Sequence, residues 1–93
     1  CHGPAGLVGA KKPDGTPLVA GKTITSFTDE EEVAVQLEKV VPFMLEATLR
    51  SEGANFVGGP MWAPHVEIDG NLITGQNPAS SEALANAVLE RLR

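Results

Sequence analysis

The chain has 93 residues, of which 42% are hydrophobic and 20% are charged, and its formal net charge is −5. This composition predicts one globular domain at most and excludes a disordered or fibrous chain. Seven basic against twelve acidic side chains, with no basic cluster, argue against nucleic acid or membrane partners. No apolar stretch approaches the roughly 18 residues that span a bilayer and no signal segment opens the chain, so we expect a cytoplasmic location.

The first 27 residues predict a short helix followed by a strand. Proline at position 4 favours a first helical turn, so this helix is expected to begin almost at Cys1. Two prolines and an Asp-Gly pair within residues 11–17 predict a loop that ends it. The β-branched run within Lys22–Phe27 predicts a strand.

Two helices and a second short strand are expected next. Thr28 and Glu31 have the spacing of a capping box, which predicts a helix start. A further helix is expected from Pro42 to Gly53, followed by a strand over residues 55–57. The apolar face of the first of these helices would comprise Val33, Leu37, Val40 and Val41.

The last third of the chain predicts a β-hairpin and a final helix. Residues 65–74 alternate around Asp69-Gly70, a strong signal for a tight turn between antiparallel strands. Gln76-Asn77-Pro78 would open the last helix. Its apolar stripe, expected to pack on a sheet, comprises Leu84, Ala85, Val88, Leu89 and Leu92.

Strands that alternate with helices predict an α/β fold with a parallel sheet and a small antiparallel extension. A chain with only three or four short strands cannot bury both faces of such a sheet by itself. The chain also begins with Cys1 rather than methionine. We therefore expect residues 1–93 to be part of a larger domain whose other part supplies central strands, and to be poorly folded on their own.

Cys1 and His2 are the first candidates for chemistry. A single cysteine forms no internal disulfide and has no companions at zinc-ligand spacing. Placed just before a helix, its sulfur would lie near the positive end of the helix dipole, which stabilises a thiolate nucleophile; the alternative is a packing cysteine. His2 could act as the base if the backbone bends sharply there, or it could be a helix-cap or core histidine.

A catalytic histidine needs an acceptor that orients its ring, and Glu30, Glu31 and Glu32 follow a predicted strand. One of the three could hold His2; alternatively all three form a solvated first helical turn, with Glu31 used for capping. His65-Val66-Glu67 has the spacing by which class I glutamine amidotransferases pair a base with its orienter, but it precedes a tight hairpin. Trp62 could line a pocket or a dimer surface, or it could be part of a simple apolar lid over a sheet.

Four segments taken in order resemble the ThiJ/PfpI superfamily, and they extend over essentially the whole chain. More narrowly, they are similar to its branch of glutathione-independent glyoxalases and stress-induced holding chaperones, proteins often described as glutamine amidotransferase-like. The segments are Cys1-His2-Gly3-Pro4-Ala5, Asp14–Leu18 with Ala20-Gly21-Lys22, Phe27-Thr28-Asp29-x-x-Glu32, and Asp69–Ser80.

The resemblance implies a flavodoxin-like, doubly wound and mostly parallel sheet of which this chain is the C-terminal half. It implies that Cys1 is the nucleophile, His2 the adjacent acid/base and Glu32 the third member of a catalytic triad. The implied reaction converts methylglyoxal, a small reactive aldehyde, to lactate without glutathione. A homodimer and a companion N-terminal half of the same domain are implied as partners.

Other functions remain open at this stage. A holding chaperone or redox sensor would bind unfolded-protein clients through exposed apolar surface and oxidise at Cys1. Amide hydrolysis occurs elsewhere in the superfamily, and an N-terminal nucleophile hydrolase would use the free amine of Cys1 as its base. No motif indicates a metal or an organic cofactor.

Overall fold

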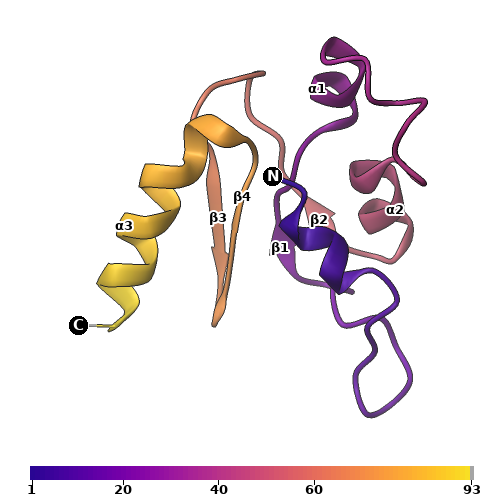
Figure 1. Cartoon of the computed structure of the whole chain (residues 1–93). Helices are drawn as coiled ribbons and strands as arrows, with labels where there is room; N and C mark the ends of the chain where they lie inside the picture. Colours follow the sequence, from indigo (N-terminus) through magenta and orange to yellow (C-terminus); the bar gives the residue numbers. More distant parts are fainter. Residues whose placement is uncertain (93) are drawn as a thin grey trace.

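The computed structural model describes residues 1–92 and contains two small β-sheets with helices packed beside them (Figure 1). The first sheet pairs β1 (Thr23–Ile24) in parallel with β2 (Asn55–Phe56). The second is the antiparallel hairpin of β3 (Val66–Asp69) and β4 (Leu72–Gly75). The helices are the 3₁₀ helix η1 (Gly3–Leu7), α1 (Asp29–Ala34), α2 (Leu45–Ser51), the 3₁₀ helix η2 (Pro78–Ser80) and α3 (Ser81–Leu92).

The backbone near Cys1 lies between the two sheets, with β1, β2 and α2 on one side and the hairpin and α3 on the other (Figure 1). Within the described residues no strand pairs with the second edge of β1. Side chains of the hairpin accept N–H groups of β1 and of the residue after it: Thr23 donates to Asp69 Oδ2 at 2.7 Å, and Thr25 donates to Thr74 Oγ1 at 2.9 Å. The hairpin is therefore attached to β1 by side chains.

A small apolar core lies between β1, β2 and α2. It consists of five buried side chains: Val19, Ile24, Leu45, Leu49 and Phe56. Leu45 and Leu49 are one helical turn apart, so one face of α2 packs against the strands. Ala5 and Leu7 of η1 pack on the same cluster, which fixes the start of the chain against this sheet.

The predicted start of α1 is confirmed, but its predicted length and apolar face are wrong. Thr28 and Glu31 form both hydrogen bonds of the capping box, yet the helix ends at Ala34. Val33 and Val40 are 54% and 73% exposed, because the chain leaves the helix before residue 37 and no described element covers them. Local capping thus sets where α1 begins, whereas burial of its side chains depends on tertiary packing.

The helix predicted from Pro42 begins three residues later, at Leu45, because Met44 is still extended (φ −85°, ψ 115°). Its predicted end is confirmed: Gly53 follows the C-cap with a φ of +92°, a conformation that glycine adopts readily. The predicted strands are present but short. The segment Lys22–Phe27 contains only the two-residue strand β1.

The predicted hairpin is confirmed, with Asp69 opposite Leu72 and Gly70 at φ +60° in the turn. The stripe on the last helix packs on the sheet only in part. Leu84 lies against Gly75 of β4, whereas Leu89 and Leu92 are 54% and 78% exposed. Among residues 1–92, no helix is both long enough and apolar enough to cross a membrane.

Candidate active site

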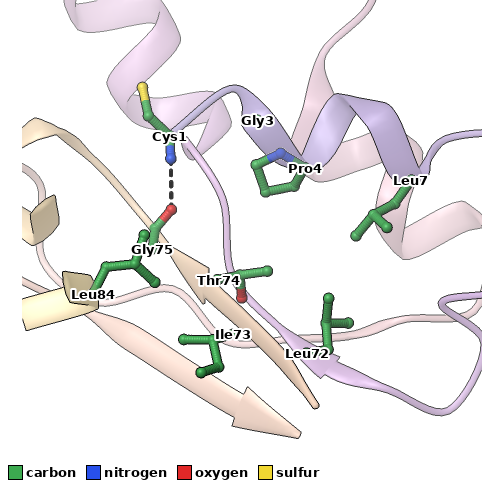
Figure 2. A pocket seen from close by; sticks show the side chains of 9 residues that line it. All are labelled: Cys1, Gly3, Pro4, Leu7, Leu72, Ile73, Thr74, Gly75 and Leu84. Atoms are coloured by element: carbon green, nitrogen blue, oxygen red, sulfur yellow. Dashed lines mark hydrogen bonds between the residues drawn. The ribbon is translucent and has the colours of Figure 1, made fainter. Parts of the chain in front are cut away.

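Two backbone hydrogen bonds hold Cys1 between β4 and the segment after β1. Its nitrogen donates to the Gly75 carbonyl at 2.7 Å, and its carbonyl accepts from the Phe27 N–H at 2.8 Å. In Figure 2 the nitrogen points toward Gly75, whereas the sulfur points the other way. The thiol therefore points away from Gly75, the last residue of β4.

The structure brings together the three predicted site residues. Cys1 Sγ lies 3.3 Å from His2 Nδ1. On the other side of the ring, His2 Nε2 lies 2.9 Å and 3.2 Å from the two carboxylate oxygens of Glu32. Because an ionised carboxylate only accepts hydrogen bonds, Nε2 is the ring nitrogen suited to donate to Glu32, and Nδ1 then faces the thiol as the acceptor for its proton.

His2 reaches Cys1 although the two residues are neighbours in sequence. His2 has φ −93° and ψ −8° and precedes η1, whose first residues are Gly3 and Pro4. The 3.3 Å contact between Sγ and Nδ1 shows that these two side chains do not diverge as neighbours on a regular helix do. The Cys1 nitrogen does not contact the thiol in this way, since it donates to the Gly75 carbonyl.

The three consecutive glutamates have different environments. Glu30 is exposed at the surface. Glu31 is fully buried and closes the capping box with Thr28, as predicted. The side chain of Glu32 is 2% exposed and contacts His2, whose own side chain is 43% exposed. The interpretation of all three as one solvated helical turn is therefore wrong for Glu31 and Glu32.

The alternative pair, His65 and Glu67, lies outside this cluster. Their side chains share a face, and His65 Nε2 is 2.8 Å from Glu67 Oε2, although without hydrogen-bond geometry. The backbone N–H of His65 donates to Ser80 Oγ, and its ring lies against Gly59. This pair therefore belongs to the packing between the hairpin and η2.

Sequence reasoning did not identify two aromatic neighbours of the cluster. The Phe27 ring lies against His2 with 4.5 Å between ring centroids, and Trp62 meets Phe27 edge-on at 5.6 Å. The sequence leaves open whether Trp62 lines a pocket or a dimer surface or forms an apolar lid. Its position behind Phe27 was not predictable because it depends on a φ of +61°, which large side chains rarely adopt.

An apolar pocket of about 260 Å³ adjoins the imidazole, and its walls are His2, Ala5, Val41, Pro42, Phe43 and Leu45. A second pocket, of about 300 Å³, lies between η1 and β4 and is drawn in Figure 2. Its walls include Leu7, Leu72 and Leu84. Cys1 also lines the second pocket, but in Figure 2 its sulfur points away from Gly75, whereas the first pocket is lined by the His2 imidazole itself.

No family model matches the chain. It is, however, 36% identical to glutathione-independent glyoxalase HSP31 of Saccharomyces cerevisiae, over the whole chain and 42% of that protein. A crystal structure of glyoxalase III from Candida albicans matches 97% of the chain with 33% identity and a TM-score of 0.82. The chain is a homologue of the glutathione-independent glyoxalases.

This homology confirms the resemblance to the ThiJ/PfpI type of protein. The chain spans about 42% of HSP31 and about 40% of the Candida structure. Another crystal structure, 60% identical with a TM-score of 0.94, covers 99% of the chain, which again corresponds to 42% of the longer protein. The predicted α/β class is confirmed, and these matches agree with the arrangement of half of a larger doubly wound domain.

Residues 1–92 contain no group of three or more His, Cys, Asp or Glu side chains arranged to hold a metal ion. The described residues place a thiol beside an imidazole, and the imidazole beside a buried carboxylate. Such an arrangement suits nucleophilic attack by sulfur followed by proton transfers at the imidazole.

Proposed function

We propose that this chain carries the nucleophile, the acid/base and the orienting carboxylate of a glutathione-independent glyoxalase. The observation that supports this most directly is the line of contacts from Cys1 Sγ through His2 to Glu32. The homology to glyoxalases supplies the reaction class. In this proposal Cys1 replaces glutathione as the thiol that adds to the aldehyde.

The reaction begins when His2 Nδ1 takes the Cys1 thiol proton and the sulfur attacks the aldehyde carbon of methylglyoxal. The imidazolium returns its proton to the alkoxide oxygen, so the hemithioacetal holds a hydroxyl on C1 and the ketone on C2. His2 then takes the proton from C1 and delivers it to C2, while the proton of the C1 hydroxyl passes to the oxygen on C2, which converts the hemithioacetal to the thioester of lactate. Water cleaves the thioester, so the free thiol is restored and the net change is methylglyoxal plus water to lactate.

Glu32 supports these steps from the far side of the ring. Its buried carboxylate keeps the proton on Nε2 and stabilises the imidazolium that forms when Nδ1 takes the thiol proton. The pocket beside His2 is lined by Val41, Pro42 and Phe43. Its apolar walls are suited to the methyl end of a small 2-oxoaldehyde.

The test is lactate formation from methylglyoxal by the intact protein in buffer without glutathione. We expect lactate to accumulate in proportion to methylglyoxal consumed, and added glutathione not to raise the rate beyond its nonenzymatic reaction with the aldehyde. A heat-denatured sample gives the background. A folded protein that produces no lactate above this background would exclude the glyoxalase function.

We further propose that residues 1–93 are the C-terminal half of one domain and work with a companion N-terminal half. The proposal is supported by the edge of β1 with which no strand of the described residues pairs, by exposed Val40 and Leu92, and by the share of each homologue that the chain spans. Produced alone, residues 1–93 are expected to show no sharp thermal transition by circular dichroism. A cooperative transition of the isolated chain would contradict a half-domain.

The holding-chaperone hypothesis remains a separate prediction. The exposed apolar residues that would serve clients are also those that a companion half would cover, so they favour neither function over the other. A Cys1→Ala variant that still suppresses aggregation of an unfolded client would support chaperone activity. Loss of that suppression in the variant would instead favour a redox sensor.

A further inference from the structure

The Glu31 side chain is 0% exposed, and no Lys or Arg of the described residues pairs with it. Its carboxylate instead accepts a set of hydrogen bonds from neutral donors. Oε1 accepts from Thr28 N at 3.1 Å, Thr28 Oγ1 at 3.0 Å and Gln76 Nε2 at 3.0 Å. Oε2 accepts from Trp62 N at 3.0 Å and Asn77 Nδ2 at 2.7 Å.

These bonds leave the carboxylate ionised at neutral pH. Burial by itself raises the pKa of Glu31, but hydrogen bonds from the Trp62 N–H, Asn77, Thr28 and Gln76 outweigh it and hold the pKa below its ordinary value. Capping of α1 needs only Oε1. The second oxygen is therefore available for a role that the capping box does not explain.

Oε2 binds the loop of residues 58–64, called here the Trp62 loop. Gln76 and Asn77 bind the same loop: Gln76 exchanges hydrogen bonds with both backbone groups of Gly59, and Asn77 Nδ2 donates to the Ala63 carbonyl. The loop is thus held near both ends and, at Trp62, in its middle. Gln76 and Asn77 therefore do more than precede the last helix, because their side chains fix this loop.

A continuous set of contacts leads from Glu31 to the reactive imidazole. Trp62 has a φ of +61°, a strained conformation for a large residue, and its N–H is the group that Glu31 holds. Its ring lies edge-on against Phe27 at an interplanar angle of 66°. Phe27 is 3% exposed and lies against the His2 ring. Movement of the Trp62 loop would remove the support behind this ring stack.

We propose that Glu31 is a positioning residue: through the Trp62 loop and the Phe27 ring, its buried carboxylate keeps the His2 imidazole between Cys1 Sγ and Glu32. Glu31 itself contacts none of the three side chains that carry the chemistry. The inference rests on the proposed function, because it concerns the thiol–imidazole pair of that reaction.

The test measures the rate at which iodoacetamide alkylates Cys1 in the intact protein at neutral pH, followed by mass spectrometry of the peptide that contains Cys1. This readout needs no substrate and depends on how well His2 activates the thiol. A His2→Ala variant sets the rate without the imidazole. Glu30→Gln is the matched control, because it makes the same change of charge at an exposed position in the same helical turn.

Glu31→Gln is expected to slow alkylation most of the way to the His2→Ala rate, and to lower kcat for lactate formation by about 10- to 100-fold with a much smaller change in KM. The reason is that the amide nitrogen of the new glutamine faces hydrogen-bond donors, and these donors lose the carboxylate oxygen that accepted from them. Glu30→Gln is expected to match the wild type in both measurements. If Glu31→Gln alkylates at the wild-type rate while His2→Ala is slow, the positioning role is wrong and the proposed function stands.

Trp62→Ala is an independent test of the positioning role. It can be used even if Glu31→Gln does not fold. It is expected to slow alkylation by a similar factor, and Glu31→Gln added to it should cause little further loss. A wild-type rate in Trp62→Ala, or losses that multiply in the double variant, would overturn the proposal. If His2→Ala alkylates as fast as the wild type, the thiol–imidazole pair itself fails, and both proposals fail with it.

Discussion

Cys1→Ala is expected to abolish lactate formation from methylglyoxal, lowering kcat by more than about 10³-fold. The variant removes the only atom of the cluster that can form the hemithioacetal, and neither His2 nor Glu32 can replace the sulfur as the thioester carrier. Water or buffer would have to attack the aldehyde directly. The measurement is the rate of lactate release, compared with the wild type at saturating methylglyoxal.

The way in which Cys1 is held makes this variant a clean test. The Cys1 side chain takes no part in the two backbone hydrogen bonds that fix the residue, so alanine is expected to keep the local structure. Cys1→Ser should be almost as inactive, because a serine hydroxyl remains protonated at neutral pH although it keeps the hydrogen bond to His2 Nδ1. Retention of more than a tenth of the wild-type rate in Cys1→Ala would show that another group is the nucleophile.

The features of the fold that depend on neighbouring residues were predictable from the sequence. The Asp69-Gly70 turn, the capping box of Thr28 and Glu31, and the glycine at the end of α2 were each correct, because the backbone conformation at these positions follows from adjacent side chains. Helix lengths and faces were less predictable. Val33 and Val40 have helical spacing, but their burial depends on elements distant in the sequence.

The candidate site was predictable in its members but not in its surroundings. Spacing alone left Glu30, Glu31 and Glu32 as alternatives, and only the resemblance selected Glu32. The structure shows the physical difference among them, because Glu31 is engaged by neutral donors from distant segments while Glu32 contacts the imidazole. A single sequence does not show such long-range hydrogen bonds, so the support from Trp62 was also missed.

Glu32→Gln is expected to lower kcat by about 10²- to 10³-fold while changing KM for methylglyoxal little. Glutamine keeps the size of the side chain, and its oxygen can still accept from His2 Nε2. It supplies no negative charge, however, so the imidazolium that forms after proton transfer from Cys1 is no longer stabilised by a buried carboxylate 2.9 Å away. A loss concentrated in kcat follows because this charge interaction develops during the reaction.

Two further variants separate charge from position. Glu32→Asp keeps the charge but shortens the side chain by one methylene, so the carboxylate withdraws from Nε2, and an intermediate loss of kcat is expected. Glu30→Gln, at the exposed neighbour, should leave kcat unchanged. If Glu32→Gln retains wild-type kcat, the imidazole does not depend on this carboxylate, and the orienting group must come from outside residues 1–93. Equal losses in Glu32→Gln and Glu30→Gln would instead indicate a general effect of charge on α1, because only Glu32 contacts the His2 ring.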